Sequence, residues 1–288
     1  MKKILLQLCS DKLANVFDTI TAYDMDVDCV LQYGGVASDD VRDLVHGAMF
    51  ARSGDDLKNT AILVGGSDLS AGEAILQAVR AEFFGPVRVS VMLDSNGCNT
   101  TAAAIVTRIF SAGEVAGKKV VVLAGTGPVG LRTAALLARE GAQVTLTSRR
   151  LARAEAACAS IEERFGVGGS PAEATDAEGM RRALEGACAA IAAGAAGVRL
   201  LPETAWVAHP TLRVLADVNA VPPLGIEGIE PAWDGEAKDG KVIFGAYGIG
   251  GLKTRVQRAC IIRLFERNDL VLDAEEIRAV AREVVDFE

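Results

Sequence analysis

Histidine is scarce in this sequence of 288 residues, and closely spaced cysteine pairs are absent. It has two histidines, His46 and His209, and its six cysteines form no C-x-x-C pair. Scattered cysteines indicate neither a disulfide framework nor a zinc site, and two isolated histidines make a poor metal site. No Ser-His-Asp or Cys-His spacing typical of a nucleophilic enzyme stands out. We therefore expect no metal, and reduced thiols in a cytoplasmic protein.

Long apolar runs and basic clusters are also missing. The longest apolar runs, such as residues 118–125 and 211–218, fall well short of the ~20 residues that a membrane-spanning helix needs. The apolar run near the N-terminus ends at Ser10, too early for a secretory signal, so it predicts a buried strand. The net charge of −8 argues against a nucleic-acid surface. We expect a soluble globular protein that binds neither membrane nor nucleic acid.

The segments that are present alternate between strand-like and helix-like patterns. Half of the residues are hydrophobic, and the length suits about two domains of ~100–200 residues each. Such alternation is typical of βα units around a parallel sheet. Residues 2–9, 28–33, 60–66 and 87–93 predict the strands of a first sheet.

A second alternating series begins at residue 117, after a predicted helix over 99–113 that bridges the two parts. Its order of strands and helices suits a doubly wound, Rossmann-type nucleotide fold. Two more helices, predicted over 253–266 and 273–287, are expected to pack back on the first domain. The sequence thus predicts an α/β protein with two domains, residues 1–105 plus about 255–288, and residues 106–254.

The loop after the strand at 117–125 carries the G-x-G-x-x-G pattern between a strand and a helix. In a dinucleotide site the first glycine permits a tight turn, the second lets the backbone approach the pyrophosphate, and the third allows close helix packing. The pyrophosphate then lies at the helix N-terminus. A glycine-rich turn without a ligand is the alternative. The six loop residues are Gly125, Thr126, Gly127, Pro128, Val129 and Gly130.

The end of the following strand indicates which dinucleotide binds. An NAD site places Asp or Glu there, whereas this chain has Ser148, Arg149 and Arg150. Arg149 offers a fork of donors to a 2′-phosphate and Ser148 adds a hydroxyl, so NADP is favoured over NAD. The alternative is that both arginines are solvated residues at the start of a helix.

Six polar residues lie between residues 92 and 104, at the carboxyl end of the last strand of the first sheet. Open α/β sheets bind ligands at this edge, but the same residue types also favour turns and helix N-caps. A ligand site and a capped turn are therefore equal alternatives. The six are Asp94, Ser95, Asn96, Asn99, Thr100 and Thr101.

Two later loops carry further candidates. Asn219 follows a late strand and is placed to reach a nicotinamide, with a plain rigid loop as the alternative. Lys253 follows the glycine-rich residues 244–251. If a helix begins there, its N-terminus and the lysine face an anion together. The alternative is a glycine-rich turn with a solvated lysine.

Together these segments resemble the NADP-dependent methylene-tetrahydromethanopterin dehydrogenases of the MtdA type, a family that includes members active on methylene-tetrahydrofolate. The resemblance covers nearly the whole chain and rests on FFGPVRVSVMLDSNGCNTTAAA, VVLAGTGPVG, DVNAVPPLGIEGI, FGAYGIGGLK, RACIIRLFE and DAEEI. It implies a pterin substrate domain at 1–105 plus 255–288 and an NADP domain at 106–254, with the pterin in the cleft between them. It also implies a cytoplasmic homo-oligomer, a trimer or a hexamer.

The resemblance further implies roles for single residues. Lys253 and Asp94 are expected to act in catalysis, the lysine by holding the pterin or its carbonyl and the carboxylate by stabilising the developing cation, with Asp18 as the alternative carboxylate. One departure stands just before Val16, where the family carries a Pro-Ser pair and this chain has Leu13, Ala14 and Asn15. The expected substrate contacts are Phe17, Asp18, Tyr23, Asn96, Asn99 and Thr100.

The implied reaction needs few catalytic groups. A methylene carbon between two nitrogens gives up hydride directly, because the nitrogen lone pairs stabilise the cation that remains, so positioning is the main task of the enzyme. We expect hydride transfer from methylene-tetrahydromethanopterin to NADP. The alternatives are the same oxidation of methylene-tetrahydrofolate, a shikimate-type dehydrogenase with Lys253 in acid–base catalysis, and a non-catalytic NADP-binding sensor.

Overall fold

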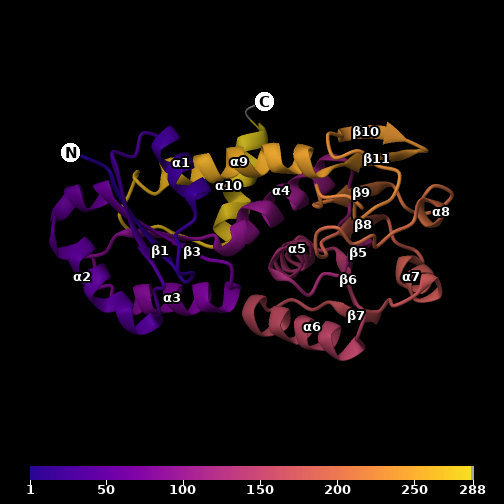
Figure 1. The fold of residues 1–288 in the computed structure, drawn as a ribbon, viewed down its shortest axis with the longest axis horizontal. Helices are drawn as coiled ribbons and strands as arrows, with labels where there is room; N and C mark the ends of the chain where they lie inside the picture. Colours follow the sequence, from indigo (N-terminus) through magenta and orange to yellow (C-terminus); the bar gives the residue numbers. More distant parts are fainter. Residues whose placement is uncertain (287–288) are drawn as a thin grey trace. The chain divides into compact units, whose positions relative to one another are not determined.

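Two sheets organise the chain in the computed structural model, which describes residues 1–286 (Figure 1). Residues 287 and 288, at the end of the predicted C-terminal segment, lie outside the described residues. The chain divides into unit 1, Met1–Thr100 with Thr254–Glu288, and unit 2, Thr101–Lys253. The boundaries fall within two helices, α4 (Cys98–Ser111) and α9 (Ala246–Arg263).

Unit 1 contains a five-stranded sheet in the order β12-β4-β3-β1-β2, with all neighbours parallel. This is the 2-1-3-4-5 order of a doubly wound sheet. The strands are β1 (Ile4–Cys9), β2 (Cys29–Gly34), β3 (Thr60–Gly65), β4 (Ser90–Leu93) and β12 (Val271–Leu272). The helices are α1 (Val16–Asp24), η1 (Ser38–Asp40), α2 (Val41–Phe50), η2 (Gly54–Asn59), α3 (Leu69–Ala81), η3 (Ser95–Gly97) and α10 (Ala274–Asp286).

Helices cover both faces of this sheet. Thr19 of α1 donates its hydroxyl to Gln7 Oε1 at 2.8 Å, whereas Leu44 of α2 lines a hollow with Leu6. Neighbouring residues of a strand point to opposite faces, so α1 and α2 lie on opposite sides of β1. Every residue of β3 and β4 is buried, as expected for parallel strands covered on both faces.

Unit 2 contains a seven-stranded sheet in the order β10-β11-β9-β8-β5-β6-β7. Only β10 is antiparallel, and the other six follow the Rossmann order 3-2-1-4-5-6. The strands are β5 (Lys119–Leu123), β6 (Gln143–Ser148), β7 (Ser170–Glu173), β8 (Ala189–Ala192), β9 (Val214–Asp217), β10 (Asp234–Lys238) and β11 (Lys241–Phe244). The helices are α5 (Pro128–Arg139), α6 (Leu151–Phe165), α7 (Ala177–Leu184) and α8 (Glu203–Trp206).

The buried contacts of unit 2 show which helices pack on each face of its sheet. Val121 and Leu123 of β5 pack in one buried cluster with Leu184 of α7 and Trp206 of α8. The opposite face of β5 and β6 is covered by α5 and α6 (Figure 1). The two doubly wound sheets confirm the predicted α/β fold class. After unit 2 the chain re-enters unit 1, where β12 and α10 belong, as predicted for the C-terminal helices.

No helix among residues 1–286 is long and apolar enough to cross a membrane.

Candidate functional site

The glycine loop, residues 125–130, joins β5 to α5 as the motif predicts. A Cβ atom on Gly125 would lie 2.7 Å from Val122 Cγ1, and one on Gly130 would lie 2.4 Å from the carbonyl oxygen of Gly125. Neither position has room for a side chain. Gly127 differs, because no protein atom lies within 4 Å of its Cβ position. The loop is therefore tightly packed at its two ends and open at its middle glycine.

The open glycine stands at the start of α5. Gly127 is the N-cap, makes no side-chain cap bond, and is followed by Pro128 in the first turn. The first N–H groups of a helix have no partner within the helix, and together with the helix dipole they favour an anion. These residues fit the pyrophosphate of a dinucleotide, because the backbone is exposed where the positive end of the helix points.

The end of β6 lies directly beside this loop. Gly125 donates its N–H to Thr147 O at 3.1 Å, and Ala124 donates to Thr147 Oγ1 at 3.0 Å. Ser148 is buried, and its Oγ accepts the N–H of Arg150 at 3.3 Å, so its own hydroxyl proton points elsewhere. Arg149 and Arg150 are exposed, and neither forms an ion pair within residues 1–286. Hydroxyl and guanidinium donors thus gather at the strand end where a 2′-phosphate is expected.

The strand order of unit 2 reverses between β5 and β8, which is where doubly wound sheets bind their ligands. Gly194, after β8, packs on the glycine loop, since a Cβ there would lie 3.0 Å from Ala124 Cβ. Asn219, after β9, donates its side-chain N–H to Ala195 O at 3.3 Å. The structure therefore brings Asn219 to the same edge of the sheet as the glycine loop.

Asn219 is held by a residue that sequence analysis did not single out. Its backbone N–H donates to Oδ1 of Asp217 at 2.9 Å, and the Asp217 side chain is buried. Burial raises the pKa of Asp217, against the lowering effect of the backbone N–H groups that it accepts. In the sequence, nothing distinguishes Asp217 from any other residue near the end of a predicted strand.

In unit 1 the loop after β4 is built around Asp94. Its Oδ1 accepts the N–H groups of Asn99 and Thr100, each at 3.0 Å, and its Oδ2 accepts the Thr100 hydroxyl at 2.6 Å. The Asn99 side chain donates to Leu93 O and to Asp273 Oδ1. All of these side chains are buried. Asp94, Asn99 and Thr100 thus form a capped turn that starts α4, which is the alternative that the sequence left open.

Asn96 occupies the exposed tip of the same loop. Its φ of 55° is in the left-handed region, and its N–H donates to Gly66 O at 2.6 Å. Such a conformation in a residue other than glycine costs energy and often marks a functional position. Among the six polar residues of this segment, Asn96 is the exposed one.

Helix α1 presents two of the predicted substrate residues and buries the third. Phe17 and Tyr23 are exposed at 47% and 51%, whereas Asp18 is buried and accepts the side-chain N–H of Gln257 at 2.7 Å. Gln257 is itself buried and was not predicted. Its partner lies 239 residues away in the sequence, so no local signal indicated the pair.

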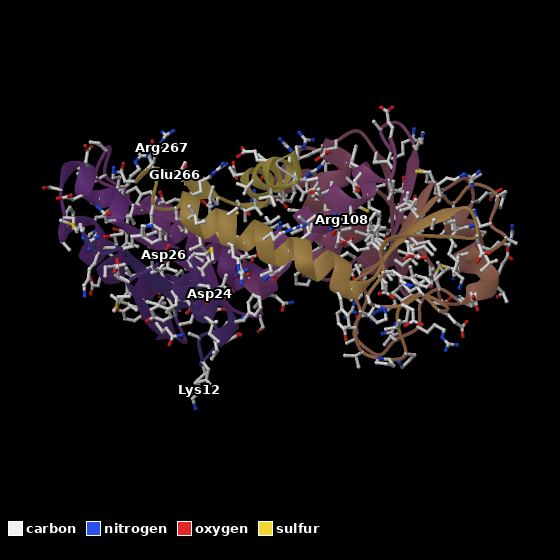
Figure 2. All side chains as sticks on the ribbon, turned by 90° about the horizontal axis from the view of Figure 1, so that it is seen from above. Lys12, Asp24, Asp26, Arg108, Glu266 and Arg267 are labelled. Carbon is white, nitrogen blue, oxygen red and sulfur yellow. The ribbon has the colours of Figure 1, made fainter. Side chains whose placement is uncertain are left out.

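The segment before α1 is where the chain departs from the family pattern. Asn15 is the N-cap of the helix, and its side chain accepts the N–H of Phe17 at 2.9 Å. Lys12 projects from this segment away from its unit (Figure 2). Leu13 is 79% exposed. In this chain the departing segment therefore supplies the helix N-cap, Asn15, and exposes Leu13.

Lys253 does not stand at a helix N-terminus, so this part of the sequence expectation is wrong. Helix α9 begins at Ala246, and the glycine-rich segment is its first turns. The reason is packing, because a Cβ on Gly248 would lie 2.6 Å from Trp233 O. Lys253 is half-buried in the interior of the helix.

No group of three or more His, Cys, Asp or Glu side chains gathers within residues 1–286. The six cysteines are free thiols, and burial raises the pKa of Cys260 strongly.

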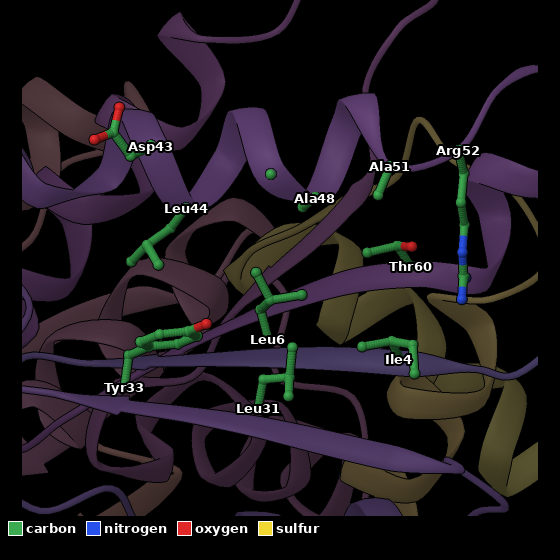
Figure 3. Close-up of a pocket in the computed structure, with 11 residues that line it drawn as sticks. Ile4, Leu6, Leu31, Tyr33, Asp43, Leu44, Ala48, Ala51, Arg52 and Thr60 are labelled. Atoms are coloured by element: carbon green, nitrogen blue, oxygen red, sulfur yellow. The ribbon is translucent and has the colours of Figure 1, made fainter.

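A hollow of about 320 Å³ lies between α2 and strands β1 and β2, and its walls are mostly apolar (Figure 3). Leu6, Leu31 and Leu44 form much of the lining, and Asp43 and Arg52 lie at its edges. It contains none of the predicted site residues.

Comparison with known proteins adds the following. Residues 16–96 match the family model described as "Methylene-tetrahydromethanopterin dehydrogenase, N-terminal". The chain is 50% identical over 285 residues to "Bifunctional protein MdtA" of Methylorubrum extorquens, covering 98% of this chain and 99% of that protein. It is 31% identical to the "NAD(P)-dependent methylenetetrahydromethanopterin dehydrogenase" of the same organism, again covering 98% and 99%.

Among solved structures, the fold is similar to shikimate 5-dehydrogenase from Listeria monocytogenes, crystallised with shikimate and NAD. The TM-score is 0.52 and the identity 13%, with 97% of this chain and 96% of that chain covered. This similarity concerns the fold alone. The sequence relatives carry the family assignment.

Proposed function

The chain belongs to the methylene-tetrahydromethanopterin dehydrogenase family, and we propose that it transfers a hydride from methylene-tetrahydromethanopterin to NADP. The products are methenyl-tetrahydromethanopterin and NADPH. The observation that carries the proposal is the open Cβ position of Gly127 at the start of α5, beside a strand end with Ser148 and Arg149 and no carboxylate. This arrangement suits a phosphorylated dinucleotide.

NADP supplies the hydride acceptor, carbon C4 of its nicotinamide, and the C–H bond of the substrate methylene breaks while the lone pair of a neighbouring nitrogen forms the amidinium. The chain contributes binding and orientation. Gly125 and Gly130 keep the loop against β5, and the N–H groups after Gly127 hold the pyrophosphate. Thr126, Pro128 and Val129 complete this loop. Ser148, Arg149 and Arg150 hold the 2′-phosphate, and Asn219 orients the nicotinamide amide.

On the substrate side we assign two kinds of role. Phe17, Tyr23 and Asn96 are exposed in unit 1 and contact the pterin. Asp18, Asp94, Asn99 and Thr100 are buried and hold those contacts in position. Lys253 holds a pterin carbonyl and takes part in catalysis by keeping the reacting carbon in place. Asp94 acts through the loop that it caps, since its oxygens accept three hydrogen bonds from Asn99 and Thr100.

The two parts of the chain have separate tasks in this proposal. Residues 1–105 and about 255–288 bind the pterin, and residues 106–254 bind NADP. The enzyme works in the cytoplasm as a homo-oligomer, a trimer or a hexamer, with small-molecule partners only. The test of assembly is the mass of the protein in solution by light scattering.

An assay of NADPH formation tests the function. Purified protein is mixed with NADP⁺ and either methylene-tetrahydromethanopterin or methylene-tetrahydrofolate, and absorbance at the NADPH band is followed. Faster turnover of the first substrate supports the proposal. Turnover of the folate alone assigns the alternative activity, and NADP⁺ binding without turnover of either pterin assigns a sensor.

A further inference from the structure

Asp217 is a buried carboxylate that the proposed reaction does not use. It is the last residue of β9 and is 1% exposed. One oxygen accepts the N–H of Asn219 at 2.9 Å, and the other accepts the N–H of Ile226 at 2.7 Å. A third backbone N–H, that of Gly225, also donates to this carboxylate. No cation is among these partners, so the carboxylate is stabilised by backbone N–H groups alone.

These bonds close the loop after β9. Asn219 is at the beginning of the loop and Ile226 is at its end, so one side chain ties the two ends together. The carboxylate needs a glycine beside it, because a Cβ on Gly225 would lie 2.8 Å from Asp217 Oδ1. The conformation of the loop is thus determined by a buried group at its base.

The closed loop is connected to the glycine loop through the segment after β8. The Asn219 side chain donates to Ala195 O, and the neighbouring Gly194 packs against Ala124. Ala124 directly precedes the first glycine of the loop. The carboxyl ends of β5, β8 and β9 therefore form one packed edge. Asp217 fixes the part of this edge that follows β9.

We propose that Asp217 is a positioning residue that sets the Asn219 amide against the nicotinamide half of NADP and leaves the adenosine half unaffected. The inference rests on the proposed function, because it assumes that NADP binds at this edge. The adenosine half is held by other groups, at the start of α5 and the end of β6. Asparagine in place of Asp217 keeps the shape but offers one acceptor oxygen, so either Asn219 or Ile226 loses its partner.

The experiment compares two ligands on the full-length protein. NADP⁺ carries both halves, whereas 2′,5′-ADP carries the adenosine and 2′-phosphate without the nicotinamide. Their dissociation constants are measured by calorimetric titration for wild type, Asp217→Asn and the control Glu236→Gln, which removes an exposed charge from β10 of the same unit. We expect Asp217→Asn to weaken NADP⁺ binding about tenfold or more and 2′,5′-ADP binding less than twofold, and Glu236→Gln to change neither.

A second variant covers the case in which Asp217→Asn fails to fold. Asn219→Ala removes the positioned amide and leaves the carboxylate, and it must show the same selective loss of NADP⁺. Equal weakening of both ligands in either variant, or wild-type NADP⁺ binding by Asn219→Ala, overturns the inference. A wild-type protein that binds neither ligand overturns the proposed function itself, so the two failures are distinguishable.

Discussion

The Cβ position of Gly130 lies 2.4 Å from the carbonyl oxygen of Gly125, at the point where α5 crosses the end of β5. That contact leaves no room for a methyl group. Three residues earlier, Gly127 has no protein neighbour within 4 Å of its Cβ position and a φ of −87°, which any residue adopts. The two glycines of this loop therefore have different roles. Gly130 allows the helix to pack closely, and Gly127 leaves the backbone accessible.

This difference gives a paired prediction. Gly130→Ala should lower the free energy of unfolding by about 1–3 kcal/mol, because the added methyl overpacks the junction. Gly127→Ala should leave the melting temperature unchanged and weaken NADP⁺ binding about tenfold or more, because the methyl stands between the helix start and the pyrophosphate. Thermal unfolding and NADP⁺ titration of both variants measure this. Gly127→Ala protein with wild-type affinity would contradict the dinucleotide site.

Arg149 is predicted to determine the choice between the two nicotinamide dinucleotides. Arg149→Ala should weaken NADPH binding about tenfold or more, through loss of a charge-assisted bond to the 2′-phosphate, and should leave NADH binding nearly unchanged. Dissociation constants follow from the quenching of protein fluorescence. Arg182→Ala, on the exposed face of α7, removes the same charge as a control. A constant ratio of the two affinities would refute the assignment.

Asp94 is predicted to matter first for stability. Asp94→Ala removes the acceptor for the N–H groups of Asn99 and Thr100, which are buried, so the free energy of unfolding should fall by about 1–3 kcal/mol. Urea unfolding measures this, with Asp55→Ala on the exposed η2 segment as the control. An unchanged stability would mean that the carboxylate is not a cap.

Lys253 is predicted to act on the rate. Lys253→Ala should lower kcat for hydride transfer about 100-fold at saturating substrate, since we assign the residue to hold the substrate. Stopped-flow measurement of NADPH formation gives the rate. Lys58→Ala in η2 is the control, because it also removes one lysine charge. A wild-type rate in Lys253→Ala would remove Lys253 from the catalytic machinery.

The thiols are predicted to react in an order set by burial. Burial raises the pKa of Cys260, which lowers the fraction of reactive thiolate at any given pH, whereas Cys29 is partly exposed. Iodoacetamide at pH 8 should therefore label Cys29 in the native protein while Cys260 stays unmodified. Peptide mass spectrometry reads both sites, and equal labelling in the native state would contradict the burial of Cys260.

Continuous burial made some strands easy to predict, although β2 was also predicted and is mostly exposed. In β3 and β4 every position is buried, so the apolar run is visible in the sequence. β7 and β10 gave no such signal, because their residues SPAE and DGEAK are mostly exposed at the edges of the sheet. β12 has two residues, too few for any periodicity.

The residues of the candidate site also differ in how far the sequence alone could predict them. The position of the glycine loop between β5 and α5 was predictable, because the motif and its flanking strand and helix are neighbours in the sequence. The role of the arginines after β6 stays a prediction. The bond between Asp18 and Gln257 joins positions 239 residues apart, and Asp217 bonds to a residue nine positions later across a loop. Only the folded chain shows such partners. The start of α9 was misplaced because its glycine-rich residues are helical and do not form a turn, with Gly248 packed against Trp233.

The place of β12 in the sheet of unit 1 has a consequence for synthesis on the ribosome. β12 pairs with β4, although residues 94–270 separate the two strands. Unit 2 has all seven of its strands once residue 244 has been made. Unit 2 can therefore reach its native topology while β4 is still unpaired on one side, before β12 has emerged from the ribosome.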